Sequence, residues 1–285
     1  MRRSLKREIG WDVKREELLT IRGEQSKRYA LSRTDNGDIL SVCSSMYKPF
    51  YNADLIQLVE RIESLSHFRC VGFEQFQKGK RILAFLKDNR PVSLLNDSAE
   101  HYLIIGNSHD QSSKIFMGLS NYMFRCENQF SRELYTLRVK HTHRLEMSDD
   151  DIKKLLTKYE RGKMEQIFLS TELSKLHVGG DEVHKFLEFL FPEPIAAEQM
   201  TGQAMETLRR SRRQRHEMLE SIQLEMKDLG KNAWGMFNGV TFFTSNRMRG
   251  NPGFGNTNGT AHRLNARAWQ YCVKLLEAYD ELQFV

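Results

Sequence analysis

The chain has 285 residues, 40% of them hydrophobic, and carries a net charge of +6. Its mean hydropathy is −0.57, and no apolar run reaches the ~18 residues that a membrane span needs, so we expect no membrane partner. The basic start has no apolar segment behind it, and four widely spaced cysteines form no CxxC motif, which predicts free thiols in a cytoplasmic protein.

The first half of the sequence predicts β-hairpins. Their strands are expected at 28–34 and 39–45, at 67–76 and 81–88, and at 101–107 and 113–126. The first hairpin has an Asn-Gly turn, which is typical of two short strands. Asn52 is expected to cap a helix that runs through Glu63. Another helix is predicted at 127–138, followed by a short strand or an extended segment at 139–145.

The second half predicts helices. They are expected at 148–176, within 179–194, and at 198–229, 232–244 and 262–282. Ser148 and the three aspartates after it are typical of a helix start, and Pro192 ends the next helix. We therefore predict an α+β protein. Antiparallel β-hairpins and a helix occupy residues 1–147, and a helical part occupies 148–285, either as two parts or as one continuous domain.

Charge is distributed unevenly along the second half. Residues 149–200 hold 7 basic and 11 acidic residues, whereas 201–276 hold 12 basic and 5 acidic residues. No acidic residue occurs from Leu229 to Leu276. An even mixture of surface charge would not leave such a gap, so this part is expected to present a basic surface to a polyanion. A solvated basic face without a ligand is the alternative.

The long helix at 198–229 carries a cluster of arginines within two turns: Arg209, Arg210, Arg212, Arg213 and Arg215. Neighbouring like charges disfavour a helix by a few tenths of a kcal/mol per pair, so compensating anions are expected. Helical spacing places Arg209, Arg212 and Arg213 on one face. Two interpretations stay open. The cluster contacts phosphates, or it pairs with the acidic residues of 149–200.

Residues 245–267, SNRMRGNPGFGNTNGTAHRLNAR, combine four arginines with many glycines and asparagines and no acid. Glycine permits close approach of the backbone to a ligand. Glycine, basic residues and one aromatic side chain, Phe254, are a common composition for contact with single-stranded nucleic acid. An unliganded loop is the alternative interpretation.

Ser, His and Asp stand side by side in NSHDQSS, residues 107–113. Adjacent residues of a turn cannot aim at one another as a catalytic triad, and these are turn-forming residues, so a turn is favoured. A metal site would use His109, Asp110, His141 and His143. No GxxxxGK[ST], GxGxxG or HExxH motif is present, so we predict no catalytic residue, no resident metal and no cofactor.

Four segments together resemble a phage- and plasmid-related family, the domain of unknown function 932. They are LSVCSSMYKPFYNADLIQLVERI, YLIIGNSHDQSSKIFMGLSNYMFRCENQF, RVKHTHRLE and NAWGMFNGVTFF, and the resemblance covers about residues 38–285. It implies a mobile-element origin and a bacterial cytoplasm, but it implies no activity. The predicted arrangement is also broadly similar to phage single-strand annealing recombinases, an analogy at the level of the fold.

The leading hypothesis is a DNA-binding, homo-oligomeric annealing or recombination protein without chemical catalysis. Its partner would be single-stranded DNA, held through the phosphates. The residues expected at this interface are Arg209, Arg212, Arg213, Arg247, Arg249, Phe254, Arg263, Arg267, Lys140, His141 and Arg144. Two alternatives are a protein-binding module that blocks or recruits a host factor, and a metal-dependent nuclease that uses the histidine set above.

Overall fold

The computed structural model describes residues 9–90, 92–94, 97–123, 128–141, 146–193, 202–248 and 259–283. The chain divides into two compact units. Unit 1 comprises Met1–Pro91, Glu100–Ser120 and Glu133–Gly162, and unit 2 comprises Val92–Ala99, Asn121–Arg132 and Lys163–Val285. The boundaries fall inside strands and inside one long helix, so the units are not two consecutive segments.

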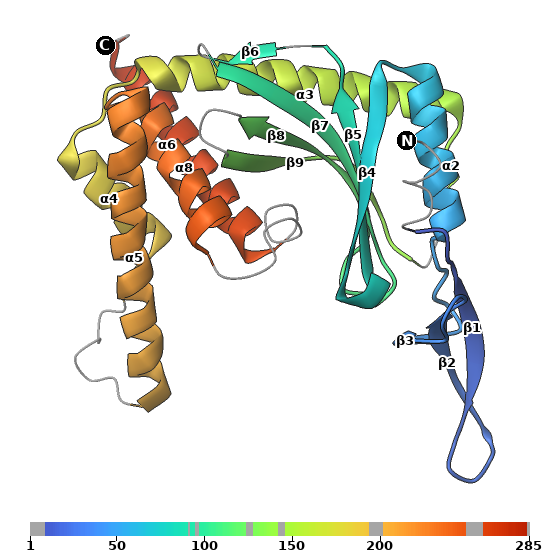
Figure 1. The fold of residues 1–285 in the computed structure, drawn as a ribbon. Helices are drawn as coiled ribbons and strands as arrows, with labels where there is room; N and C mark the ends of the chain where they lie inside the picture. The colour runs from blue at the N-terminus through green and yellow to red at the C-terminus, as the bar shows by residue number, and fades with distance from the viewer. Residues whose placement is uncertain are drawn as a thin grey trace. The chain divides into compact units, whose positions relative to one another are not determined.

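A small antiparallel sheet in unit 1 consists of β1 (Val13–Leu19), β2 (Gln25–Arg33) and β3 (Ile39–Ser44), in that order (Figure 1). The pairing of β2 with β3 confirms the first predicted hairpin. Sequence analysis did not predict β1, because its central residues Lys14–Glu17 are all charged. Charged side chains on an edge strand are nevertheless a usual protection against pairing with other chains.

The larger sheet has the strand order β4-β5-β7-β8-β9, with β6 paired to β7. Its strands are β4 (Phe68–Phe76), β5 (Arg81–Asp88), β6 (Val92–Leu94), β7 (Asp97–Ser108), β8 (Ile115–Met123) and β9 (Asn128–Val139). The second and third predicted hairpins are confirmed. The helix predicted at 127–138 is wrong, because β9 occupies this segment. Pairing with the backbone of β8 outweighs the local helix propensity there.

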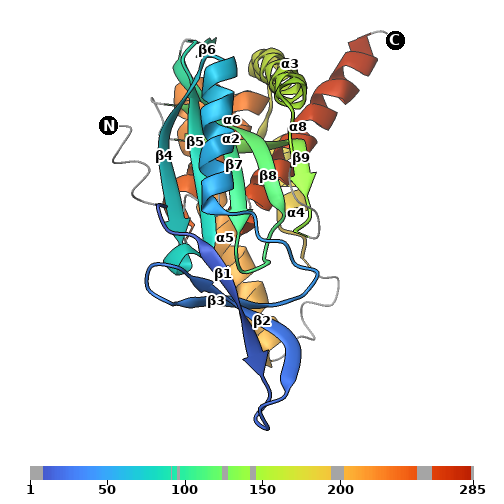
Figure 2. The same ribbon diagram turned by 90° about the vertical axis from the view of Figure 1, so that its right-hand side faces the viewer.

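Helix α2 (Asn52–Leu65) packs along β4, and its apolar face lies in the core of unit 1 (Figure 2). The prediction that Asn52 caps this helix is wrong. The Asn52 side chain instead donates to the carbonyl oxygen of Trp11 at 2.8 Å. The carboxylate of Asp12 accepts from the backbone nitrogens of Asn52 and Ala53, at 3.2 and 3.3 Å, and thereby satisfies the helix start.

The helices predicted in the second half are present. They are α3 (Asp149–Lys175), α4 (Gly180–Leu190), α5 (Gly202–Leu229), α6 (Ala233–Phe242) and α8 (Thr260–Gln283). Ser148 caps α3 as predicted, since its Oγ accepts from the backbone nitrogen of Asp151 at 3.2 Å. A π-helical turn, η3 (Phe243–Arg247), continues α6. The predicted α+β fold class is therefore confirmed.

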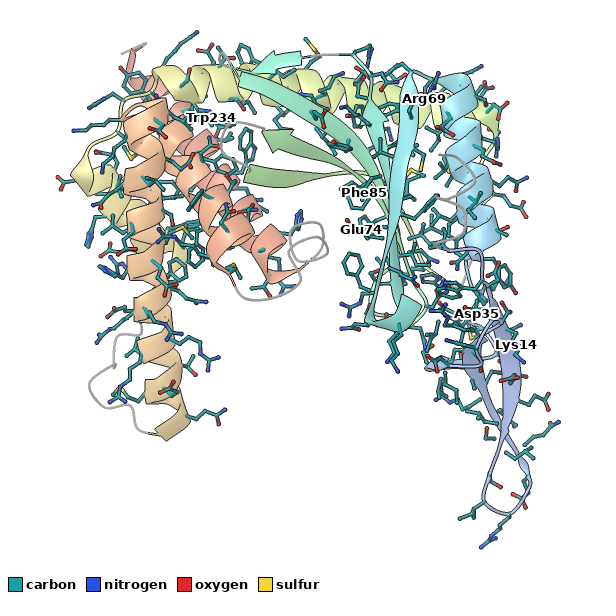
Figure 3. All side chains as sticks on the ribbon, in the orientation of Figure 1. Lys14, Asp35, Arg69, Glu74, Phe85 and Trp234 are labelled. Atoms are coloured by element: carbon teal, nitrogen blue, oxygen red, sulfur yellow. The ribbon has the colours of Figure 1, made fainter. Side chains whose placement is uncertain are left out.

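Helix α6 forms the centre of unit 2. Its residues from Ala233 to Thr241 are all buried, and Trp234 points in among the neighbouring helices (Figure 3). Helices α5 and α6 come unusually close, because a Cβ at Gly239 would lie only 2.3 Å from the Cα of Ile222. Among the described residues, no helix combines the length and the apolar character that crossing a membrane requires.

Candidate nucleic-acid interface

Four of the five arginines of α5 form two pairs that are centred on opposite sides of the helix. At 100° per residue, the midpoint of Arg210 and Arg213 lies about 160° from the midpoint of Arg212 and Arg215, and Arg209 falls between Arg212 and Arg213. The packing of unit 2 gives the two pairs different neighbours. Helix α4 lies against one side of α5. Helix α6 and η3 also contact α5, and η3 brings Arg247 to the side of α5 that carries Arg210 and Arg213. The five arginines therefore spread over more than half of the circumference of α5 and do not share one face.

The group that faces α4 is paired with acidic residues. Arg212 makes a two-pronged contact with Glu193, with nitrogen–oxygen distances of 3.0 and 2.8 Å. This guanidinium lowers the pKa of the Glu193 carboxyl by hydrogen bonding. Arg215 lies 4.0 Å from a carboxylate oxygen of Glu188. For Arg212 and Arg215, the geometry matches intramolecular pairing with the acidic segment 149–200.

The two arginines of α8, Arg263 and Arg267, contact different parts of unit 2. The guanidinium of Arg267 lies 5.2 Å from the ring centre of Phe189 and donates to the carbonyl oxygen of Leu190 at 3.3 Å. It thus satisfies carbonyls at the C-terminal end of α4, which lack partners within their own helix. Arg263 is exposed in the first turn of α8 and donates to the hydroxyl of Thr260 at 3.2 Å.

The other group of arginines surrounds a hollow of about 810 Å³, which we call the basic hollow. Its lining residues are Arg210, Arg213, Gln214, Glu217, Phe243, Arg247 and Met248. Three arginines against one glutamate give this lining a net charge of +2. The hollow brings Arg247 together with two arginines that precede it by more than 30 residues.

Local structure fixes Arg247 at the rim of the basic hollow. Arg247 is the last residue of η3, and π-helical turns occur frequently at functional sites. Its Nη1 donates to a carboxylate oxygen of Glu220 at 2.8 Å and to the carbonyl oxygen of Glu217 at 3.2 Å. These contacts orient the guanidinium and leave it one-third exposed.

The arginines of α5 at the basic hollow are less constrained. Arg213 lies 3.8 Å from a carboxylate oxygen of Glu217, which is a loose contact at the surface of the helix. Arg209 and Arg210 are exposed and have no hydrogen bond or ion pair within the described part of the chain. Arg210 was not among the residues that the sequence assigned to the interface. Its spacing of three residues from Arg213 is the signal that places both on one face.

Unit 1 holds Lys140 and His141, two further residues expected at the interface. Lys140 is exposed just after β9. His141 is only 8% exposed, and its ring stacks on that of Tyr47 with centroids 5.0 Å apart. This ring is thus removed from the surface at which we expected it to contact phosphates. Arg144, Arg249 and Phe254 lie outside the described residues, as do His143 and the centre of the Gly/Asn-rich segment.

The NSHDQSS segment forms a turn, as predicted. The Asp110 carboxylate accepts from the backbone nitrogen of Ser112 at 3.0 Å, and Ser108 Oγ accepts from that of Ser113 at 3.0 Å. His109 is fully buried, and its Nε2 lies 3.0 Å from Oδ1 of Asn52. Burial lowers the pKa of His109 to about 3, so the ring is neutral at pH 7.

The described members of the predicted histidine set are therefore engaged in structural contacts.

Elsewhere in unit 1, His67, Asp88 and Glu160 lie close enough to share a metal ion. Arg90 already makes ion pairs with both of these carboxylates, and its nitrogen lies 3.2 Å from Asp88. The arrangement is an ion-pair cluster in which the guanidinium supplies the cation.

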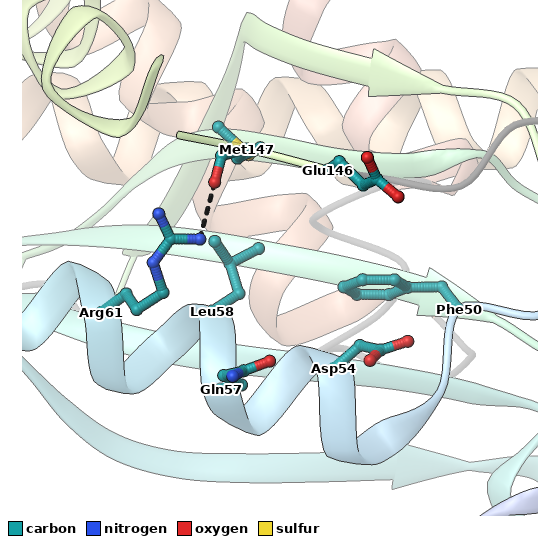
Figure 4. A pocket seen from close by; sticks show the side chains of 7 residues that line it. All are labelled: Phe50, Asp54, Gln57, Leu58, Arg61, Glu146 and Met147. Atoms are coloured by element: carbon teal, nitrogen blue, oxygen red, sulfur yellow. Dashed lines mark hydrogen bonds between the residues drawn. The ribbon is translucent and has the colours of Figure 1, made fainter. Parts of the chain in front are cut away.

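A polar pocket of about 310 Å³ in unit 1 contrasts with the basic hollow (Figure 4). Asp54 and Glu146 line it, and Arg61 supplies its one positive charge. Arg61 donates to the carbonyl oxygen of Met147 at 2.6 Å (Figure 4) and forms an ion pair with Asp149 at 2.5 Å. With a lining charge of −1, this pocket does not suit a polyanion.

The fold and the surface define an α+β protein whose unit 2 carries an arginine-lined hollow. Residues 39–269 match the family described as "Domain of unknown function (DUF932)". The match covers most of the chain, and the protein belongs to this family. Comparison with curated proteins and with solved structures found no match.

Proposed function

We propose that the protein binds single-stranded DNA by its phosphate backbone at the basic hollow of unit 2. The observation that carries the proposal is the convergence of Arg210, Arg213 and Arg247 on one hollow with a net positive lining. Guanidinium groups bind phosphate through parallel hydrogen bonds, and their fixed charge requires no particular base sequence.

Backbone binding suits annealing or recombination without chemical catalysis. Screening of phosphates lowers the repulsion between two strands and leaves their base edges accessible. Assembly of several copies on one strand would add avidity. The proposed setting is a bacterial cytoplasm, where such a protein acts in replication or recombination of a mobile element.

Fluorescence anisotropy with a labelled single-stranded 40-mer across a salt series tests the proposal. Three phosphate contacts at about −0.7 each predict a log–log slope near −2. Two 40-mers of unrelated sequence are expected to bind within about threefold of each other, since phosphates carry no sequence information. Absence of binding at low salt, or binding that does not change with salt, would remove the proposal.

The same protein preparation separates the two alternatives. A host partner that is retained after nuclease treatment, with no DNA bound in the anisotropy assay, would indicate a protein-binding module. Cleavage of the 40-mer in Mg²⁺ or Mn²⁺ would indicate a nuclease. The proposal predicts an intact oligonucleotide under both conditions.

A further inference from the structure

A second concave surface of unit 2, which we call the apolar groove, lies between α4 and α5 and has a volume of about 680 Å³. Its apolar lining consists of Val178, Val183, Leu187, Leu219, Ile222 and Met226. The groove lies on the opposite side of α5 from the basic hollow, since α4 packs there. It is thus a separate site that the proposed DNA contact does not use.

Helical spacing explains the continuous apolar lining. Val183 and Leu187 are four residues apart on α4, whereas Leu219, Ile222 and Met226 follow each other at intervals of three and four on α5. The two helices run in opposite directions, because Gly180 lines the groove near Lys227 while Glu188 lies near Arg215. Two apolar strips therefore extend along the length of one groove.

The rim of the apolar groove carries cationic side chains at the C-terminal end of α5. Lys227 and Lys231 line the groove, are exposed, and have no ion pair within the described part of the chain. No described acidic residue lines it. Two acidic residues of α4 are engaged elsewhere, because Glu182 accepts from the backbone nitrogen of Gly179 at 2.9 Å and Glu188 lies 3.1 Å from His184.

We propose that the apolar groove binds an amphipathic anion, a single apolar chain that ends in a carboxylate. The carboxylate lies between Lys227 and Lys231, and the chain extends over Met226 and Leu219, which are partly exposed. Charge complementarity selects this occupant. A neutral chain would leave two lysines unused, and a nucleic-acid backbone would leave the apolar lining uncovered.

Displacement of the fluorescent probe 11-(dansylamino)undecanoic acid tests the proposal on the intact protein. Decanoate and dodecanoate are expected to displace the probe, with affinity rising by up to about fourfold per added methylene. The methyl ester of decanoate, which lacks the charge, is expected to compete at least about tenfold more weakly. Equal competition by acid and ester, or no saturable binding of the probe, would overturn the proposal.

Variants locate the site. Lys227→Glu combined with Lys231→Glu is expected to weaken probe binding by about tenfold or more. Leu219→Gln is expected to weaken the binding of decanoate and of its methyl ester to the same extent. Lys274→Glu, at an exposed position of α8 outside the groove, is a single charge-reversal control and is expected to leave binding unchanged. An equal loss in the control, or wild-type binding in the double variant, would contradict the assignment.

A second readout separates this site from the basic hollow. The double lysine variant is expected to keep its affinity for the single-stranded 40-mer, because its substitutions lie across α5 from Arg210 and Arg213. Its folding is checked by thermal melting alongside the Lys274→Glu control. Saturable binding of the carboxylate probe without any DNA binding would support the apolar-groove proposal and remove the DNA proposal. DNA binding without saturable binding of the carboxylate probe would overturn the apolar-groove proposal and leave the DNA proposal standing.

Discussion

The NSHDQSS turn of unit 1 and the arginines of α5 in unit 2 place their polar side chains in different environments. In unit 1, His109 and Asn107 are buried, and each has a fixed hydrogen-bond partner, Asn52 Oδ1 and the carbonyl oxygen of Phe50. In unit 2, Arg210 and Arg213 of α5 are exposed, and Arg213 makes only a loose contact with Glu217. The two cases differ in burial and in how firmly each side chain is held. Substitutions in unit 1 are therefore expected to change stability, and those at the basic hollow to change binding.

A large effect on stability is expected from the acid sensitivity that His109 gives to unit 1. Its pKa is about 3 in the folded chain and about 6.5 in the unfolded chain, because burial disfavours the charged ring. As pH falls from 6.5 towards 3, only the unfolded chain takes up the proton, so stability is lost in this window. Above pH 6.5 the ring is neutral in both states and contributes no pH dependence. Between pH 7 and 4.5 the loss is about 2 to 3 kcal/mol.

Urea unfolding at the two pH values measures this loss. The control is His109→Gln, which removes the titrating ring, and its stability is expected to change less between the two pH values than that of the wild type. An equal change in both proteins would show that other groups cause the acid sensitivity.

In unit 2, the close packing of α5 against α6 makes stability sensitive to the size of the side chain at Gly239. Gly239→Ala is expected to lower the free energy of unfolding by about 3 kcal/mol, because the new methyl group meets the backbone of Ile222 and the helices must separate. Gly180→Ala is the matched control, since a Cβ there meets no atom within 4 Å. Urea unfolding of both variants checks the prediction, and equal stability of the two would contradict it.

The basic hollow is expected to respond in binding and not in stability. Replacing Arg210, Arg213 and Arg247 together with alanine is expected to weaken binding of a single-stranded 40-mer on the order of 30-fold at 50 mM salt, about 2 kcal/mol. The control is Arg212→Ala with Arg215→Ala, which removes two charges from the other side of α5. Losses of binding free energy in proportion to the number of charges removed, measured by anisotropy, would show that binding depends on net charge alone.

The smallest effect is expected for the paired arginine that faces α4. Arg212→Ala removes the contact with Glu193, which is exposed to solvent and screened, so the melting temperature is expected to fall by less than about 3 °C. Differential scanning fluorimetry measures the change. A fall of more than 10 °C would mean that this ion pair fixes the position of α4.

Much of the fold follows from local sequence signals. The hairpins joined by short turns and the helices with clear starts, such as the one capped by Ser148, were predictable because neighbouring residues determine them. Strand β9 was not, since its conformation depends on pairing with β8. The helix cap of α2 was missed for a related reason, because Asp12 supplies it from 40 residues away.

The candidate site was predictable in composition but not in arrangement. The absence of acidic residues from Leu229 to Leu276 and the arginine cluster pointed to the half of the chain that contains the basic hollow. Which arginines face each other depends on where α4 and η3 pack against α5, and sequence periodicity does not specify this. Arg212 consequently lies with Glu193, whereas Arg210, which was not assigned, lines the hollow with Arg213.

The salt dependence of binding tests the central claim most directly. The slope of log affinity against log salt for a single-stranded 40-mer is measured for the wild type and for the triple variant at Arg210, Arg213 and Arg247. Loss of three phosphate contacts is expected to make the slope shallower by about 2. An unchanged slope would contradict the assignment of the basic hollow as the DNA contact.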